Sequence, residues 1–255
     1  TDRLPGELAR SEGDAKVTDV AVNEAYDYSG DTYDFYERLF GRNSLDNKGM
    51  TLISSVHVAE VDSSGEFVPM SNAFWNGRQM AYGDGDGVVF QRFTRSLDVV
   101  GHELTHGVQS FTSNLFYLGQ SGALNEHFSD VFGVLVRQWR NEETVARANW
   151  LVGVEVLTPA KTRRAIRDME NPGTAFVNDP DIGTDPQPAH MSKIFKGTAD
   201  RGGVHINSGI PNRAFVLAAK AIGGKAWEVA GRIWYDTLVQ LNNFSQFKDC
   251  AKLSI

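Results

Sequence analysis

The segment from Val99 to Gly107 constrains this chain more than any other stretch, because it places two histidines and a glutamate in the pattern H-E-x-x-H. Apolar residues recur around it at helical spacing, at Leu97, Val100, Leu104 and Val108. On a helix, residues four apart share a face, so His102 and His106 point the same way. Two neutral imidazoles placed like this form half of a tetrahedral zinc site, with Glu103 beside them as a candidate proton acceptor.

A catalytic zinc site needs a third protein ligand and leaves its fourth position to water. Glu126 and Asp130 follow Gly119 and lie four residues apart, so both can face the histidines from a second helix. One can bind the metal while the other accepts the second ring N–H of a ligand histidine. The alternative is an ordinary acidic helix face, but the apolar residues around these carboxylates would bury them, and buried carboxylates need a partner.

A zinc motif extended by a third histidine would require Gly at position 109 and His at position 112. The chain has Gln109 and Thr112 instead, which excludes that class and favours a glutamate as third ligand.

Composition limits the partners. The net charge of -7, without a basic stripe, argues against a nucleic-acid partner. The apolar runs are too short to span a membrane, so we expect no membrane partner. The single cysteine, Cys250, excludes an internal disulfide framework. The chain begins at Thr1 without an initiator Met or an apolar signal segment, which suggests a processed form.

The sequence predicts an α+β fold of two lobes, with a strand-rich lobe over residues 1–96 and a helical lobe over residues 97–255. An extended arm is expected at 1–15, then one or two helices between Thr18 and Phe40 with a break near Gly30. Strands are predicted at 50–61, 66–75, 78–82 and 87–91. Helices are predicted at 97–113, 122–139, 143–152, 190–195, 209–221, 224–241 and from 244, and a long loop at 168–190. The H-E-x-x-H helix then lies at the seam between the lobes, where substrate clefts tend to form.

Five motifs in order resemble those of the thermolysin family of zinc metalloproteases. They are Asn72–Trp75, Met80–Gly87, the V-V-G-H-E-L-T-H-G-V run, the S-G-A-L-N-E-x-F-S-D run and Gly202–Asn212. The short N-terminal lobe and the stretch Asp185–Met191 look most like the protealysin-type branch. The resemblance covers nearly the whole chain and implies a thermolysin-like fold with the zinc helix at the cleft.

Carried over by motif position, the resemblance implies a role for each residue of the site. His102, His106 and Glu126 would bind zinc, Glu103 would activate its water, and Asp130 would orient His102. His205, held by Asp200, and Tyr117 would hydrogen-bond the oxyanion. Residues implied to bind substrate are Asn72, the Ala73 carbonyl, Trp75, Asn125 and Arg167, with Phe90, Phe93, Val99 and Ile166 lining an apolar pocket. His57, His127 and His190 are interpreted as unrelated to the metal, because no spacing links them to it.

Two departures from the family pattern are visible. Many relatives carry a double calcium site, but this chain has Arg137, Asn149 and Val154 where acidic residues would be expected. An arginine opposes a dication, so we predict one zinc ion and no double calcium site. Relatives also continue well beyond a segment like 242–247, whereas this chain ends at Ile255.

The function favoured is a zinc endopeptidase that cleaves on the N-terminal side of bulky hydrophobic residues. A truncated or inactive zinc-binding homologue that acts as a binding protein is the alternative. A zinc aminopeptidase is a weaker third hypothesis. Such an enzyme needs an acidic pocket to bind the free α-amine of its substrate, and no motif in the sequence indicates one. The resemblance also implies protein or peptide substrates, a propeptide that inhibits the enzyme before maturation, and export, with the cytoplasm as an alternative. We expect a monomer.

Overall fold

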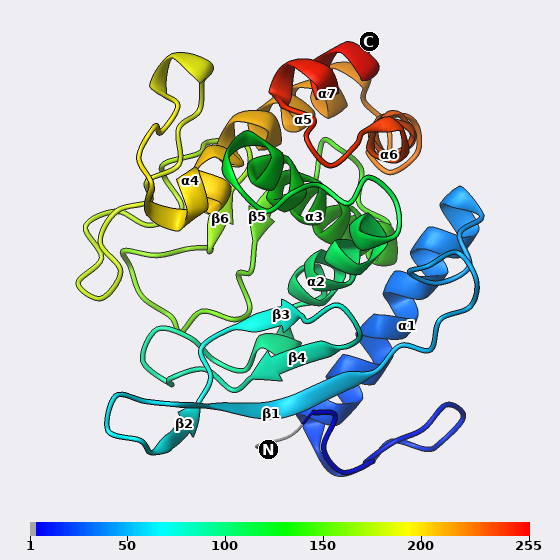
Figure 1. The fold of residues 1–255 in the computed structure, drawn as a ribbon, viewed down its shortest axis with the longest axis vertical. Helices are drawn as coiled ribbons and strands as arrows, with labels where there is room; N and C mark the ends of the chain where they lie inside the picture. The colour runs from blue at the N-terminus through cyan, green and yellow to red at the C-terminus, as the bar shows by residue number, and fades with distance from the viewer. Residues whose placement is uncertain (1–3) are drawn as a thin grey trace.

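The computed structural model describes residues 4–255, in which a small sheet and a long helix pack against a helical part (Figure 1). The first long element is α1, Val20–Phe40. The strands β1 (Ser54–Val61), β2 (Phe67–Pro69), β3 (Ala73–Trp75) and β4 (Met80–Gly83) follow. They form one sheet in the order β2-β1-β4-β3, in which β1 and β4 run parallel and the other pairs antiparallel.

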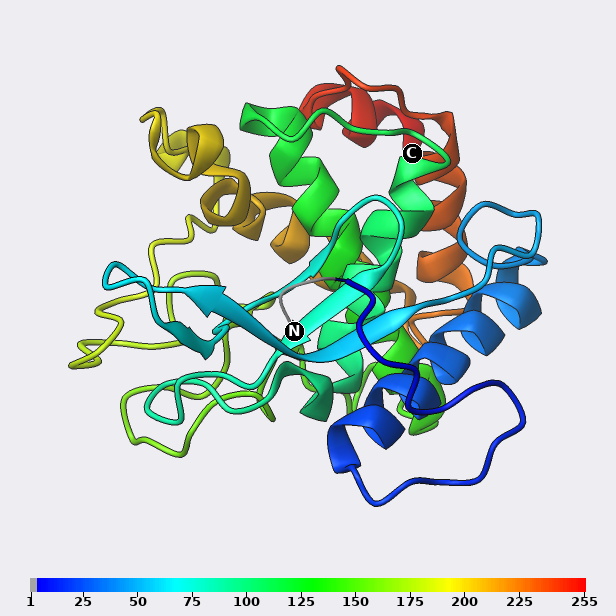
Figure 2. The ribbon, with the colours of Figure 1, turned by 60° about the horizontal axis from the view of Figure 1, so that its bottom comes forward.

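The helical part follows a short 3₁₀ turn, η1 (Phe93–Arg95). Its elements are α2 (Leu97–Ser110), α3 (Gly119–Arg140), the two-residue strands β5 (Leu151–Val152) and β6 (Arg167–Asp168), the 3₁₀ turn η2 (Met191–Lys193), α4 (Ala199–Asn207), α5 (Gly209–Ile222), α6 (Val229–Gln240) and α7 (Phe247–Leu253). With the bottom of the molecule turned forward, the sheet lies in front of α2 and α3, with α1 beside it (Figure 2). Within residues 4–255, no helix is both long and apolar enough to cross a membrane.

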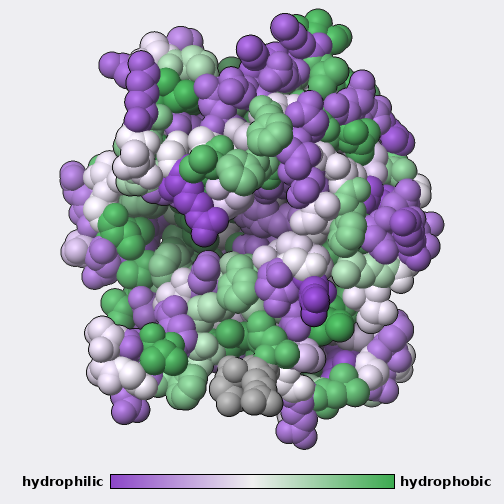
Figure 3. Space-filling view, viewed as in Figure 1, coloured by the Kyte–Doolittle hydropathy of each residue, from purple (hydrophilic) through white to green (hydrophobic). Residues whose placement is uncertain are grey.

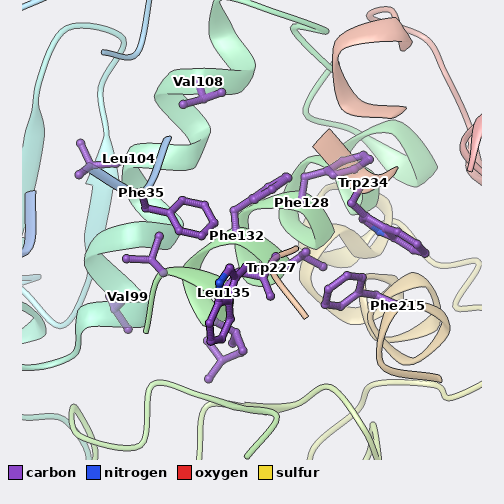
Figure 4. Packing of buried hydrophobic residues seen from close by; sticks show 14 of the residues in the cluster. Phe35, Val99, Leu104, Val108, Phe128, Phe132, Leu135, Phe215, Trp227 and Trp234 are labelled. Atoms are coloured by element: carbon purple, nitrogen blue, oxygen red, sulfur yellow. The ribbon is translucent and has the colours of Figure 1, made fainter. Parts of the chain in front are cut away.

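The core is built around α3, which is buried along most of its length. Phe132 and Leu135 of this helix lie between α2, represented by Leu104 and Val108, and the later helices, represented by Phe215 (Figure 4). All five side chains are fully buried or nearly so. Because α3 is packed on every side, side chains that it directs toward α2 are held rigidly.

Helices α2 and α3 approach closely because glycines face each other at the crossing. A Cβ added to Gly101 would lie 3.1 Å from the Cα of Gly133. A Cβ added to Gly133 would collide with the carbonyl oxygen of Asp98 and lie 2.9 Å from the backbone nitrogen of His102. The missing side chains therefore set the distance between the two helices.

The predicted break near Gly30 is wrong, because α1 is one continuous helix. Asp19 caps its N-terminus, with its carboxylate accepting the N–H groups of Ala21 and Val22, and Gly41 ends it in the left-handed conformation. Buried Ala25 and Phe35 pack into the core on either side of the glycine. Such packing outweighs the roughly 1 kcal/mol that a glycine costs in a helix.

Three other local predictions are also wrong. Residues 87–91 are no strand: the Asp86 carboxylate accepts the N–H groups of Val88, Val89 and Phe90, and only Phe90 forms a bridge, with Leu157. Residues 143–152 are no helix and end in β5, and 190–195 shortens to the turn η2. The helix α4 was not predicted. Of the expected arm at 1–15, residues 4–15 form neither helix nor strand, and 1–3 lie outside the described residues.

The glycine contact generates a stability prediction. Gly133→Ala should lower the free energy of unfolding by about 1–3 kcal/mol, because the added methyl group forces α2 and α3 apart. Gly30→Ala is the matched control: a Cβ there meets no atom within 4 Å, so this variant should gain roughly 0.5–1 kcal/mol. Urea unfolding of both variants measures the difference. A Gly133→Ala variant as stable as the wild type would contradict the close packing.

Candidate metal centre

Three side chains from α2 and α3 converge on one point. His102 and His106 lie one turn apart on α2, and Glu126 faces them from α3. The two Nε2 atoms are 3.1 Å apart. One Glu126 carboxylate oxygen lies 3.4 Å from Nε2 of His102, and the other lies 3.5 Å from Nε2 of His106. The structure thus brings together the three residues that the motifs predicted as metal ligands.

This arrangement fits a zinc ion. Ligand atoms of all three residues lie within 4.8 Å of one another. Zinc binds nitrogen and oxygen at about 2.0–2.2 Å, so two ligands at tetrahedral corners are about 3.3–3.5 Å apart, close to the separations observed. Glu126 Oε2 is also buried without a hydrogen-bond partner. A buried carboxylate oxygen in that state needs a cation or a donor. Three ligands leave one corner of a tetrahedron for a further group.

Carboxylates around His102 favour a positive charge at this point. Burial opposes that charge, but the neighbouring carboxylates of Asp130 and Glu126 outweigh it and raise the pKa of His102 to about 10. Burial also works to raise the pKa of Glu126, yet the charges of His205, His106 and His102 hold it well below its usual value. Metal binding would displace the proton from His102, as ligation of an imidazole requires.

Each ligand histidine has an outer partner on α3. Asp130 lies 2.9 Å from Nδ1 of His102, in the orienting position predicted for it. Asn125 Oδ1 lies 2.6 Å from Nδ1 of His106, and Ser129 Oγ lies 3.1 Å from the same atom. Hydrogen bonds of this kind fix the ring and direct Nε2 at the metal.

Asn125 therefore lies elsewhere than the resemblance implied. It is buried, its amide oxygen lies against Nδ1 of His106, and its amide nitrogen donates to the carbonyl of Leu115, so both polar atoms of its side chain are engaged within the protein. Ser129 was missed. Its spacing from Asn125, four residues on one helix face, was the available signal.

Glu103 adjoins the three ligands but lies outside the group that they form. Its side chain is almost buried, and the backbone N–H of Trp75 bonds its carboxylate. Burial, reinforced by the charge of Glu126, raises the pKa of Glu103 to about 7. A carboxylate with such a pKa can take up and release a proton near neutral pH.

His205 reaches the same centre from a left-handed turn. Residues Asp200–Gly203 all have positive φ between 49° and 82°, which folds the chain back so that Asp200 caps the helical turn that follows. The Asp200 carboxylate lies 2.6 Å from Nδ1 of His205 and accepts the backbone N–H of the same residue. Nε2 of His205 is then 3.1 Å from the hydroxyl of Tyr117, which donates to Glu126.

The backbone of β3 borders the site with an open edge. The Asn72 carbonyl accepts the N–H of Gly83, and the Asn76 N–H donates to Gln79, so these residues bond inward to the rest of the sheet. Backbone groups of alternate residues point to opposite sides of a strand, so those of Ala73 and Trp75 face the edge that has no neighbouring strand. Such an edge can pair with an extended peptide.

An apolar cavity of about 220 Å³ adjoins the metal centre. Of the four residues predicted to line it, Phe90 and Ile166 do so, whereas Phe93 and Val99 are buried in the hydrophobic core. Arg167 and His205, which were predicted to have other roles, also line the cavity. Further lining residues that the sequence did not indicate are Leu157, Phe176, Ile182, Asp185, Pro186, Gln187 and Ile206. On the face shown in Figure 3, a recess opens between the helical part above and the strands below.

Arg167, at the wall of this cavity, is held by Asp130. Its Nε and Nη2 atoms donate to the two Asp130 oxygens at 2.7 and 2.6 Å. Burial favours the neutral guanidinium, but the charge of Asp130 outweighs it and raises the pKa of Arg167. The same contact lowers the pKa of Asp130, so the carboxylate behind His102 stays ionised.

The remaining histidines divide into two kinds. His57 lies between Asp19 and Asp84, and His190 caps the turn η2, both apart from the metal centre. His127, which was interpreted as unrelated to the metal, is not among the residues that could hold it. It contacts Asn212, which donates to Asp130. The link runs through another helix, α5, and no sequence spacing could reveal it.

Comparisons with known proteins agree with this geometry. The family model described as "Thermolysin metallopeptidase, catalytic domain" matches residues 6–110, and "Thermolysin metallopeptidase, alpha-helical domain" matches residues 113–255. An "Extracellular metalloprotease" of Pectobacterium carotovorum subsp. carotovorum is 52% identical over 92% of this chain and 65% of its own length. "Protease PrtS" of Photorhabdus sp. (strain Az29) is 49% identical over 99% of this chain and 67% of its own length.

A solved structure, "Precursor of Protealysin, Metalloproteinase from Serratia proteamaculans", aligns with a TM-score of 0.93 and 51% identity, over 99% of this chain and 76% of that one. The chain thus spans about two thirds of the two curated relatives and three quarters of this precursor. The α+β fold predicted from the sequence is confirmed by this likeness. Family models that together match almost the whole chain, and relatives about half identical to it, show that the chain belongs to the thermolysin metallopeptidase family.

Proposed function

We propose that this chain is the catalytic part of a zinc endopeptidase that cuts on the N-terminal side of bulky hydrophobic residues. The observation that carries the proposal is the convergence of His102, His106 and Glu126 at zinc-compatible separations beside the buried carboxylate of Glu103. In the proposed division of the chain into residues 1–96 and 97–255, this centre lies at the seam between two lobes.

His102, His106 and Glu126 would hold the metal. When bound, zinc supplies a Lewis acid that activates water and polarises the peptide carbonyl. Glu103 accepts a proton from the attacking water and passes it to the leaving amine, for which a pKa near 7 is suited. His205 and Tyr117 face the negative charge that develops on the carbonyl oxygen, and removal of one such donor typically costs about 10²–10³ in rate. Asp200 fixes the ring of His205 so that Nε2 faces Tyr117.

Substrate would lie extended along the open edge of β3. The carbonyl of Ala73 accepts a hydrogen bond from the peptide backbone, and the Asn72 side chain, which is exposed, adds a second contact. Arg167 faces the carbonyl that follows the scissile bond. It contacts Asp130 through Nε and Nη2, which leaves the donors of Nη1 for substrate.

The apolar cavity would take the side chain that follows the scissile bond. Phe90, Leu157 and Ile166 form one side, and Phe176 and Ile182 from the 168–190 loop form another. A large hydrophobic side chain gains about 25 cal/mol per Å² of apolar surface removed from water, so such a cavity favours bulky apolar residues. It holds no pair of free carboxylates for a terminal amine, since the oxygens of its one carboxylate, Asp185, accept N–H groups of Gly173, Ala175 and Gln187. This favours an endopeptidase over an aminopeptidase.

We also propose that the double calcium site of many relatives is absent here. The Arg137 guanidinium donates to the Asp98 carboxylate, to the carbonyls of Asn149 and Leu151, and to the Asn149 side chain. Oxygen atoms of this kind are calcium ligands, and here they surround an organic cation instead. Val154 supplies no oxygen from its side chain.

The partners and the location are proposed from the relatives. One solved relative is titled a precursor, and one curated relative is named extracellular. We propose that this enzyme is likewise made with an inhibitory propeptide, is exported, and acts as a monomer on proteins or peptides.

Glu103→Gln tests the catalytic assignment. The amide keeps the shape of the side chain but cannot accept the proton, so casein hydrolysis should fall by about 10²–10⁴-fold while one zinc per chain is retained. Casein cleavage and zinc content, measured on the same samples, check this. A wild-type chain that holds zinc but cuts nothing would favour the binding-protein alternative, and failure on peptides blocked at the N-terminus would favour an aminopeptidase.

Ile182→Ala tests the pocket. The smaller side chain enlarges the cavity, so the ratio of kcat/KM for Phe or Trp over Leu after the scissile bond should rise by about 3–30-fold. Val177→Ala is the matched control, because Val177 belongs to the same loop but is exposed outside the cavity. A peptide library profiles all three enzymes. Equal profiles for wild type and Ile182→Ala would place the preference elsewhere.

Metal analysis tests the calcium proposal. The chain should contain one zinc ion and no stoichiometric calcium. Arg137→Met should lower stability by about 3–5 kcal/mol, because it leaves the Asp98 carboxylate buried without its partner. Arg140→Met removes an exposed arginine paired with Asp31 and should cost about 1 kcal/mol or less. Calcium found bound at Asp98 would refute the proposal.

A further inference from the structure

A chain of buried polar side chains connects α6 to the metal ligand His102. The indole Nε1 of Trp234 lies 2.8 Å from Nε2 of His127. Nδ1 of His127 lies 2.7 Å from Oδ1 of Asn212, whose amide nitrogen lies 2.8 Å from Oδ2 of Asp130. His127, Asn212 and Asp130 have no exposed surface, and Trp234 is 7% exposed.

The direction of each hydrogen bond in this series of side chains follows from the first donor, the indole N–H of Trp234. An indole N–H can only donate, so Nε2 of His127 must accept, and the ring proton resides on Nδ1. Nδ1–H then donates to Oδ1 of Asn212, which orients the amide so that its NH₂ group donates to Asp130.

Asn212 thereby adds a second donor to Oδ2 of Asp130, whose two oxygens are also bonded by Arg167. Oδ1 accepts from His102 and from Arg167, and Oδ2 accepts from Arg167 and Asn212. A carboxylate held on both oxygens cannot rotate, so its Oδ1 stays aimed at Nδ1–H of His102. The opposite nitrogen of His102 then points at the metal.

We infer that His127 and Asn212 are positioning residues for the metal centre, and that with Trp234 they lock Asp130 so that His102 is held ready for zinc. The apolar surroundings support this. Trp234 packs against Phe215 at 4.9 Å between ring centroids, within the hydrophobic cluster shown in Figure 4. Burying the polar groups of Trp234, His127 and Asn212 in this cluster carries a desolvation cost that apolar side chains of similar size would avoid. Packing alone therefore does not explain why these residues are polar.

The test is zinc affinity, measured on folded protein by competition with a chelator. Loss of an outer partner of a zinc ligand typically weakens binding 10–100-fold. Asn212→Leu should therefore weaken zinc binding at least about 10-fold, and His127→Phe, one step further out, about 3–10-fold. Cobalt in place of zinc should give an altered visible absorption spectrum in both variants. Zinc affinity within twofold of wild type in both variants would overturn the inference.

The control is Phe215→Leu, which disturbs the same cluster but removes no polar atom. It should lower stability and leave zinc affinity within about twofold. An equal loss of affinity in this control would assign the effect to general loosening of the core and overturn the inference. Trp234→Phe keeps a ring and removes only the outer donor, so it supplies the test if His127→Phe does not fold. The Trp234→Phe variant should bind zinc about 2–5-fold more weakly, and an unchanged affinity would again overturn the inference.

The double variant His127→Phe/Asn212→Leu asks whether the residues act in series. If they do, the pair loses no more affinity than Asn212→Leu alone. If the fold-losses in zinc affinity of the two single variants instead multiply in the double variant, the residues act separately, which would contradict the inference. The inference rests on the zinc site proposed above, and the two can fail separately. If the wild-type protein does not bind zinc, the proposed zinc site is refuted. If the wild type binds zinc and the variants bind it equally well, only the positioning role of His127 and Asn212 is refuted.

Discussion

The close contact of α2 and α3 at Gly101 and Gly133 is the constraint on which the rest of the centre depends. A metal ion with ligand distances near 2 Å tolerates little variation in the separation of the elements that hold it. Here His102 adjoins Gly101 in the chain, and its backbone nitrogen lies against Gly133. The contact that sets the helix separation is thus one residue from the first proposed ligand, and Asp130 and Glu126 lie about one and two turns before Gly133 on the facing helix.

Charge in the centre is balanced by groups that the sequence does not place together. Glu126, Asp130 and Glu103 are all buried, and the cost of burying three carboxylates must be offset. Arg167 provides one fixed positive charge through its two bonds to Asp130. His102, whose pKa is raised, provides a charge that depends on protonation, and a zinc ion would provide two. Because the Arg167 guanidinium bonds to Asp130, no fixed positive charge pairs with Glu126, and its carboxylate is available to bind a metal ion. The pKa of Glu103, with no full positive partner of its own, rises toward neutrality.

Sequence reasoning succeeded where one helix or one motif carries the information, and failed where a contact between distant elements decides. The spacing of His102 and His106 predicted that both face one point, because i,i+4 geometry on a helix is local. The same spacing offered both Glu126 and Asp130 as third ligand, and only the family resemblance selected Glu126. The predicted helix break near Gly30 is wrong, because the helix α1 continues through this glycine owing to its packing against the core, which the local sequence does not reveal. The wall formed by Phe176 and Ile182 comes from a loop whose course no pattern predicts. It is held by Arg163, which pairs with Asp179 and Asp181, and by the contacts of Asp185. The contact of His127 with Asn212 could not be predicted for the same reason, since it joins α3 to a third helix, α5.

The site divides its parts between rigid and irregular elements, and this division has a physical reason. The proposed metal ligands and their partners Asn125, Ser129 and Asp130 all lie on two buried helices, where a shift of a few tenths of an ångström is resisted by the packed core. The groups proposed to meet substrate come instead from the edge of β3, the turn that carries His205, and the 168–190 loop. A peptide must enter and leave along that surface, so backbone there has to stay open to solvent and to new hydrogen bonds. Gln187 joins the two kinds of element: its amide nitrogen donates to the carbonyl of His205 and to Ser208, so the loop that walls the cavity also holds the turn that aims His205. Substitutions in that loop should therefore change both the side chain that the proposed pocket accepts and the position of His205, the proposed oxyanion donor.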